Sequence, residues 1–480
     1  MKTPFLLLLP LVFLRASGAA DANTVVKLAR EAPAEYAADA MIRLASTETL
    51  GHDARVKLLN EAFRRAAEAQ HALRLHASIT RVGSPGGFLE RAYRQDLDTM
   101  SLRLRVVREM LPLDSAKATK LFLSMARPSV PAVRCDEMVV YDPSGYYDGL
   151  GAIAKISPRD PAKLLKDRVG GLTSPAQIAP VARLLHQLDL KDADLQALTL
   201  SLAASLREIS GDDRSFTYYA EVTGRAIQDL ADDLNGRQVA TLPLAEAYRL
   251  YLVNHLSADR CADDELLNNG PPSFYLTTGR PAETQGAAAA ALFAAKIMVP
   301  PLKALSEQEM TPKSLDGFAA GVHACEDATC QNVNELARQL AFGPEGQPLT
   351  EAQHNTDGWR QTLEATLAAL DGWQAGNGQA DIVFREKTAV YSNLFLMSPG
   401  KSREAVARSW LGYLKRSRPT VSDRTQWLLP VSALIGRAAL DPANTGLAAL
   451  LRAQDDPVIS LYVKLEALAP RQAEKILLLL

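Results

Sequence analysis

The sequence lacks the short motifs by which many enzymes are recognised. There is no HExxH helix of the kind that binds catalytic zinc, and no GxSxG turn that presents a nucleophilic serine. The segment Ser398-Pro399-Gly400-Lys401-Ser402 ends like a phosphate-binding loop, but Phe395 stands where such a loop needs its first glycine. We therefore predict no catalytic residue, no metal site and no cofactor.

An excess of charge of one sign and long apolar runs are also missing. The 53 basic residues nearly balance the 55 acidic ones, which argues against a nucleic-acid partner because such proteins present a basic surface. No stretch of eighteen apolar residues occurs, so we predict no integral membrane segment in the mature chain. Apolar residues make up 47% of the chain, a value typical of globular proteins.

The first twenty residues are typical of a secretory signal. Lys2 precedes an apolar run from Pro4 to Leu14, and the small residues of 16–20 offer a site for signal peptidase. The apolar run is too short to cross a bilayer as a helix, although an uncleaved anchor is the alternative. We expect an exported protein that is periplasmic or extracellular after cleavage of residues 1–20.

Four cysteines are present, and export would permit disulfides. Cys325 and Cys330 are close enough in sequence for a turn to join them, which leaves Cys135 to pair with Cys261. The alternative is a metal site built from Cys325, Cys330 and the histidines His323 and His354, but this spacing matches no common zinc pattern. The predicted disulfides are thus Cys135–Cys261 and Cys325–Cys330.

Apolar residues recur at helical spacing through most of the chain. In residues 51–70, Leu59 and Phe63 share one face, while Glu61 and Arg65 can pair at i, i+4 on another. Strand patterns are nearly absent. The best candidate, Met138 to Tyr141, has no evident partner and would not be stable alone.

Several helix starts are recognisable from capping residues. Asp456 followed by Pro457 predicts the start of a helix, and Thr420 with Asp423 resembles a capping box. Ser402 can cap a helix that follows it. Helices joined by short polar turns predict an all-α fold of stacked antiparallel helix pairs, α-solenoid-like and possibly in two halves.

The strongest break in the helical pattern is the Asn-, Gly- and Pro-rich stretch 268–273. We therefore predict a signal peptide at 1–20 and two helical, repeat-like domains at 21–275 and 276–480. All four tryptophans lie in the second domain, and they are expected to be core residues or, alternatively, a ligand platform. They are Trp359, Trp373, Trp410 and Trp427.

Several short sequence segments resemble those of a group of secreted, all-helical acidobacterial proteins of unknown function. The layout of residues 33–70 is also similar to a helix pair of tetratricopeptide or HEAT size, without the tetratricopeptide signature residues. The first resemblance implies export and an all-α fold, and it assigns no activity. The segments that carry the first resemblance are Glu31 to Ala40 with Leu44-Ala45, Glu61-Ala62-Phe63, Cys135 with Val140-Tyr141-Asp142, Arg260 to Asp263, and Phe384 to Lys387 with Tyr391.

The most irregular stretch, Pro128 to Tyr147, is the candidate binding loop. Tyrosines beside charged groups suit a peptide or a sugar, although the tyrosines can equally be packed in a structural crossover. The candidate residues are Arg134, Asp136, Tyr141, Asp142, Tyr146 and Tyr147.

A binding function fits this pattern better than catalysis. We expect a helical-repeat binding or scaffolding protein of the periplasm or cell envelope, with a protein or peptide partner. The alternative is a hydrolase of envelope polymers whose carboxylate pair is hidden among ordinary surface charges.

Overall fold

The computed structural model describes residues 18–77, 85–134, 139–156, 161–211, 213–258, 328–376, 379–441, 445–471 and 476. It confirms the all-α prediction: the described residues form 19 α-helices and one two-stranded sheet. They divide into two compact units, Met1–Gln70 with Arg108–Ser115 and Ala328–Leu480, and His71–Val107 with Ala116–Asp327. None of the described helices is both long and apolar enough to span a membrane.

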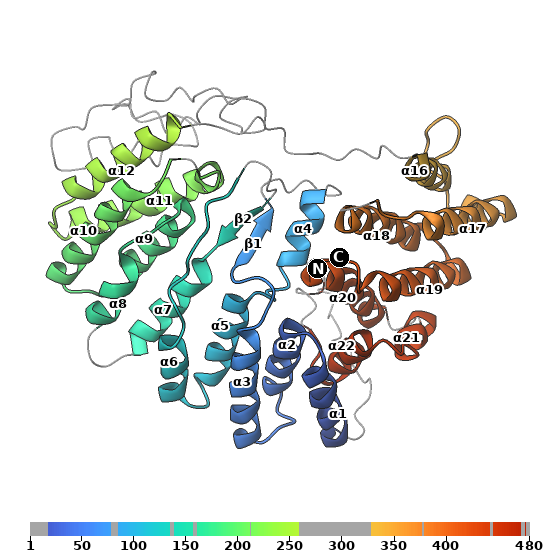
Figure 1. Ribbon diagram of the computed structural model, residues 1–480, viewed down its shortest axis with the longest axis horizontal. Helices are drawn as coiled ribbons and strands as arrows, with labels where there is room; N and C mark the ends of the chain where they lie inside the picture. Colours follow the sequence, from blue (N-terminus) through green and yellow to red (C-terminus); the bar gives the residue numbers. More distant parts are fainter. Residues whose placement is uncertain are drawn as a thin grey trace, which may run out of the picture. The chain divides into compact units, whose positions relative to one another are not determined.

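Unit 1 contains the first and the last helices of the chain. Helices α1 and α2 both pack against α22, and α2 also packs against α3 (Figure 1). The helices of this unit are α1 (Gly18–Glu31), α2 (Ala34–Ala45), α3 (His52–Ala66), α16 (Ala328–Ala341), α17 (Asp357–Gly372), α18 (Ala380–Met397), α19 (Gly400–Ser417), α20 (Arg424–Leu440), α21 (Thr445–Arg452) and α22 (Pro457–Leu468).

Unit 2 consists mainly of stacked helices, among which α9 packs against α11 and α10 against α12. A short sheet, β1 (Arg74–Ala77) with β2 (Val139–Asp142), packs beside them through contacts with α4 and α11. The helices are α4 (Pro85–Tyr93), α5 (Thr99–Met110), α6 (Ser115–Leu123), α7 (Ser144–Ile156), α8 (Pro161–Val169), α9 (Ile178–Gln187), α10 (Asp192–Glu208), α11 (Ser215–Gly236) and α12 (Leu242–Leu256), of which α5 and α6 run across the unit boundary.

The division into units differs from the predicted domains. The predicted boundary near residue 275 falls outside the described residues. Residues 21–70 belong with Ala328–Leu480, whereas the prediction grouped them with residues 71–275. The predicted signal at 1–20 also lies outside the described residues, except for Gly18–Ala20 at the start of α1.

Aromatic side chains fill the core of unit 1. All four tryptophans are buried, which favours the core interpretation over a ligand platform. The Tyr36 ring of α2 contacts Trp427 of α20, with centroids 6.4 Å apart, and meets Tyr462 of α22 edge-on at 6.0 Å. Burial of large rings is a major stabilising contribution, so these contacts hold the first helices against the last.

A buried ion pair strengthens the same packing. Arg43 on α2 donates to Glu466 on α22 at 2.7 Å and to the carbonyl of Ala469 at 2.6 Å. The carboxylate of Glu35, one turn before Asp39 on α2, pairs with Arg424 at the start of α20. Polar residues at i, i+4 and i+8 on α2 therefore face inward, which the amphipathic pattern of the sequence does not predict.

Candidate functional site

The candidate site is built on the two-stranded sheet of unit 2. The strands are antiparallel, with His76 opposite Val140 and Arg74 opposite Asp142. Alternate side chains point to opposite faces of a strand, so Leu75 and Ala77 pack on α4 while His76 faces the other way. The prediction of a strand near Met138 to Tyr141 is therefore correct in position, but the expectation that it has no partner is wrong.

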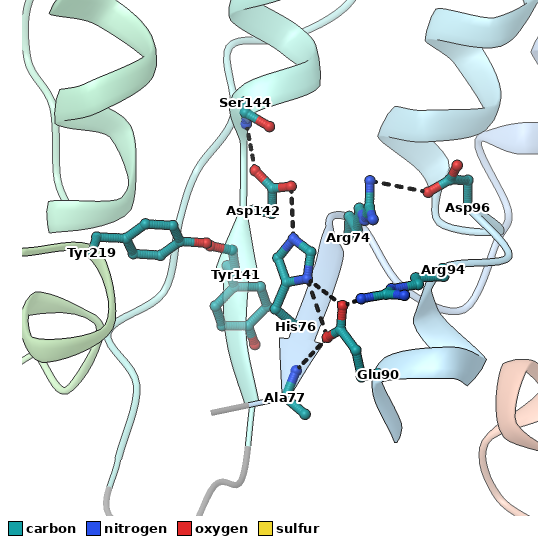
Figure 2. Close-up of polar contacts among 10 residues, drawn as sticks. All are labelled: Arg74, His76, Ala77, Glu90, Arg94, Asp96, Tyr141, Asp142, Ser144 and Tyr219. Atoms are coloured by element: carbon teal, nitrogen blue, oxygen red, sulfur yellow. Dashed lines mark hydrogen bonds and ion pairs between the residues drawn. The ribbon is translucent and has the colours of Figure 1, made fainter. Parts of the chain in front are cut away.

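His76 lies between two carboxylates, as Figure 2 shows. Its Nδ1 is 3.1 Å from Oε1 and 3.2 Å from Oε2 of Glu90 on α4. Its Nε2 is 3.0 Å from Oδ2 of Asp142 on β2. The side chain of His76 is only 18% exposed, and those of Glu90 and Asp142 are 8% and 12% exposed. The three groups thus join β1, β2 and α4 through one largely buried cluster.

The electrostatics of this cluster favour three ionised groups. Burial by itself lowers the pKa of His76, but hydrogen bonds to Asp142 and Glu90 and their charges outweigh it and raise the pKa to about 9. Burial raises the pKa of Glu90, but the hydrogen bond and charge of His76, with smaller effects of Ala77 N–H and Arg94, lower it to about 2. The same balance holds the pKa of Asp142 well below its usual range, with Ser144 as a further donor.

A side chain binds one outward-facing backbone group on each strand. On β1, the backbone N–H of Ala77 donates to Oε2 of Glu90 at 3.0 Å. On β2, the hydroxyl of Tyr219 from α11 donates to the carbonyl of Tyr141 at 2.8 Å (Figure 2). Unpaired edge groups are the usual point at which a foreign strand adds to a sheet. These two groups are therefore not open to a strand that would extend the sheet.

The chemistry open to the cluster follows from these contacts. A general base needs a ring nitrogen without a proton, and both nitrogens of the His76 imidazolium are occupied as donors to carboxylates. A glycosidase-type general acid needs a carboxyl group with a raised pKa, and Glu90 and Asp142 both have lowered values. The cluster is suited to holding the sheet and α4 together rather than to proton transfer.

The cluster reaches solvent through an aromatic and cationic rim. Tyr218 of α11 stacks on the His76 ring, with centroids 6.2 Å apart and planes inclined by 20°, and is 39% exposed. Arg94 donates to Oε1 of Glu90 at 3.1 Å with a side chain that is 41% exposed. Burial raises the pKa of Tyr218 most, and the charges of Glu90, Asp142, Arg74 and Arg94 all act on its hydroxyl. We call Arg91, Arg94 and Tyr218 the rim.

Arg91 is the least compensated charge of the rim. It is half-buried on α4, and burial together with the like charge of Arg94 lowers its pKa. Among the described residues, no carboxylate pairs with it. A half-buried guanidinium beside another cation is unfavourable unless an anion approaches both. The rim therefore suits a ligand that carries a carboxylate.

The predicted binding residues have different surroundings. Asp142 belongs to the buried cluster, and Tyr141 is half-buried with its carbonyl bound by Tyr219. Tyr146 and Tyr147 are core residues, each 1% exposed, which favours the packing interpretation. Arg134 is exposed, and Asp136 lies outside the described residues.

Sequence reasoning missed His76, Glu90 and the rim. The segment Leu73 to Ala77 alternates apolar and polar residues, which is a strand signal, and it places His76 on the polar face. No local pattern could reveal that Glu90 and Asp142 converge on this histidine, because 66 positions separate His76 from Asp142.

Of the four cysteines, only Cys330 lies among the described residues. It is buried near the start of α16, and the other three cysteines lie outside the described residues. The pairings Cys135–Cys261 and Cys325–Cys330 therefore stay predictions. Within the described ranges, no group of three or more His, Cys, Asp or Glu side chains could hold a metal ion. His323 and Cys325 of the alternative metal site lie outside those ranges.

The pKa values predict how the stability of unit 2 varies with pH. Because the pKa of His76 rises from 6.5 to about 9 on folding, its stabilising effect is complete below pH 6.5 and is lost as pH rises through 9. Glu90 acts in the opposite direction: its effect is complete above pH 4.5 and is lost as pH falls through 2. We expect the difference in unfolding free energy between wild type and His76→Ala to be largest at pH 4.5–6.5.

This prediction is checked by amide hydrogen exchange of β1 and β2 at pH 6 and pH 9.5 in both proteins, after correction for intrinsic exchange rates. The shift of His76 corresponds to roughly 3 kcal/mol at most, since one pKa unit is worth about 1.4 kcal/mol. A difference that is equal at the two pH values would show that His76 is not held as an imidazolium.

Comparisons with known proteins provide no further assignment. The resemblance to secreted helical proteins therefore stays a prediction. The chain matches no protein-family model, no curated protein and no solved structure.

Proposed function

We propose that this chain is an exported binding or scaffolding protein of the cell envelope, which holds a protein segment bearing acidic side chains. The observation that supports this most is Arg91, a half-buried cation that no carboxylate of the described residues pairs, three residues from Arg94, whose charge acts on the half-exposed Tyr218. Arginine and tyrosine are enriched where protein interfaces are strongest. Stacked helices supply a rigid support for such a surface.

Export is supported by the signal-like sequence of residues 1–20, and it would permit the predicted disulfides. Disulfides persist in oxidising compartments such as the periplasm. The hydrolase alternative gains no support from the His76 cluster, because a neutral carboxylic acid is needed there and both carboxyl groups have lowered pKa values.

The proposal predicts a site-specific cross-link. A photo-reactive phenylalanine analogue in place of Tyr218, illuminated in intact producing cells, should form an adduct with one envelope protein. The same analogue at Leu250 of α12 is the matched control, since this residue is similarly exposed at 44% in the same unit. Mass spectrometry should place the cross-link in an acidic segment of the partner.

The second step removes the proposed charge contact. Arg91→Gln should reduce the adduct from position 218 by about tenfold or more, since hydrogen bonds to a charged group contribute about 1.5–3 kcal/mol. The proposal would be contradicted if the analogue formed the same adducts at 218 and 250, or if the adduct contained polysaccharide rather than protein. An undiminished adduct in Arg91→Gln would contradict it as well.

A further inference from the structure

The first turn of α19 in unit 1 has unusual electrostatics. The helix runs for 18 residues from Gly400, and its N-cap residue, Pro399, supplies no side chain to bind the free N–H groups. The first turn contains no acidic residue and instead carries Lys401 and Arg403. Cations at a helix N-terminus oppose the helix dipole, whereas anions there are stabilising.

A second arginine approaches from a neighbouring helix. Arg437 of α20 lies over the ring of Phe395 at 5.7 Å, and Arg403 lies over the same ring at 5.8 Å. The Nε of Arg437 is buried without a hydrogen-bond partner, and burial and the charge of Arg403 lower its pKa. Arg403 donates through Nε to the carbonyl of Ser398 at 2.8 Å. No ion pair joins either arginine to a carboxylate of the described residues.

Ser398 provides an independent indication of a missing acceptor. It is fully buried directly before the N-cap Pro399, and its hydroxyl has no hydrogen-bond partner. A buried hydroxyl without a partner costs free energy and is rare in native proteins. The backbone carbonyl of Ser398 accepts from Arg403, so the residue with the unpaired hydroxyl lies in the turn that Arg403 contacts.

Simpler roles explain only part of this arrangement. Arg437 lies in the last turn of α20, where a cation interacts favourably with the helix dipole, and Phe395 offers both arginines an aromatic face. Neither role explains why the two cations meet beside an uncapped N-terminus and an unpaired hydroxyl. Phe395 in place of the first glycine excludes a phosphate-cradling loop, but a helix N-terminus binds anions without such a loop.

We infer that the N-terminus of α19, with Arg403, Arg437 and the hydroxyl of Ser398, is a binding site for the phosphoryl group of a small soluble molecule. The free N–H groups of Gly400 and Lys401 would donate to the phosphoryl oxygens, and the two guanidinium groups would neutralise their charge. Gly400 and Lys401 are exposed and both arginines are half-buried, so an ion can reach them from solvent, whereas the buried hydroxyl of Ser398 must turn toward it. This site involves none of the rim residues and is independent of the proposed partner.

Calorimetric titration of the full-length mature protein with inorganic phosphate tests the inference, at constant ionic strength with chloride as the reference anion. Glycerol 3-phosphate is titrated in parallel to distinguish a free phosphate site from a phosphomonoester site. We expect saturable binding of one ion per chain for at least one of these probes. Arg437→Gln should weaken it by about tenfold or more. Arg408→Gln, an exposed position later in α19, should leave the affinity unchanged.

Lys401→Gln is the second variant, because this exposed side chain can be changed without disturbing the core. It should weaken binding by a smaller factor in a protein that is fully folded by tryptophan fluorescence. The inference would be overturned if neither probe bound saturably or if chloride bound equally well. It would also be overturned if the affinity were unchanged in both Arg437→Gln and Lys401→Gln.

Discussion

Replacing His76 by alanine is expected to destabilise unit 2 by about 3–5 kcal/mol, because the change leaves two largely buried carboxylates without their shared counter-ion. Glu90 would keep only Arg94 and the Ala77 N–H, and Asp142 would keep only its contact with Ser144. Without His76, each carboxylate must either stay charged while largely buried or take up a proton against its ordinary pKa, and both outcomes cost stability at neutral pH.

The measurement is urea unfolding followed by hydrogen exchange of peptides covering β1, β2 and α4. Tryptophan fluorescence serves as an internal reference, because all four tryptophans lie in unit 1 and unit 2 has none. His186→Ala is the matched control, since His186 is exposed at the end of α9 in the same unit. A loss below 1 kcal/mol for His76→Ala, or an equal loss for both variants, would show that the cluster does not hold the sheet.

Arg43→Ala is expected to have a comparable effect on unit 1, about 3–5 kcal/mol. Arg43 is 9% exposed, and its removal leaves the Glu466 carboxylate with only the backbone N–H of Arg471 and takes away the Arg43 donor of the Ala469 carbonyl. Because these groups connect α2 with α22 and the chain just beyond it, the change should loosen the first helices from the last. Loss of protection in α1 and α2 should accompany an earlier fluorescence transition.

Fluorescence reports this change directly, since Trp427 contacts Tyr36 of α2. Arg64→Ala provides the control, because Arg64 is exposed on α3 of the same unit. If Arg43→Ala unfolds like the control, the buried ion pair contributes little and the aromatic contacts alone hold the unit.

Local patterns predicted helices and some of their ends correctly. Asp456 accepts hydrogen bonds from Val458 and Ile459 at the start of α22, as the Asp-Pro pattern predicts. Asp423 alone caps α20, so the expected capping box with Thr420 is wrong. Ser402 lies inside α19 rather than at its cap. Capping residues recur near a helix start, and which one is used depends on tertiary packing.

Pairings between distant residues were less predictable. Glu61 was expected to pair with Arg65 along α3, but its carboxylate binds Arg30 of α1 at 2.8 Å, and Arg65 donates to the carbonyl of Arg30. Helical spacing allows the first pair but cannot exclude a better-placed partner on another helix. The same limit applies to α2, whose inward polar residues find partners on α20 and α22.

The candidate site shows this limit most clearly. Asp142 was recognised as a site residue from its loop, whereas its partner His76 was not, since it belongs to a strand that only tertiary contacts make visible. Arg91 and Tyr218 resemble ordinary surface residues in the sequence. Arg91 matters because no carboxylate of the described residues pairs with it, and Tyr218 matters because its ring stacks on His76.

The charge state of His76 tests the account most directly, because it decides between an ionic clamp and a catalytic histidine. A side-chain nitrogen NMR titration of the protein, with His76→Ala used to assign the signal, should show both ring nitrogens protonated at pH 7.5 and titration only near pH 9. A His76 that is neutral at pH 7.5, with one ring nitrogen free to accept a proton, would contradict the account.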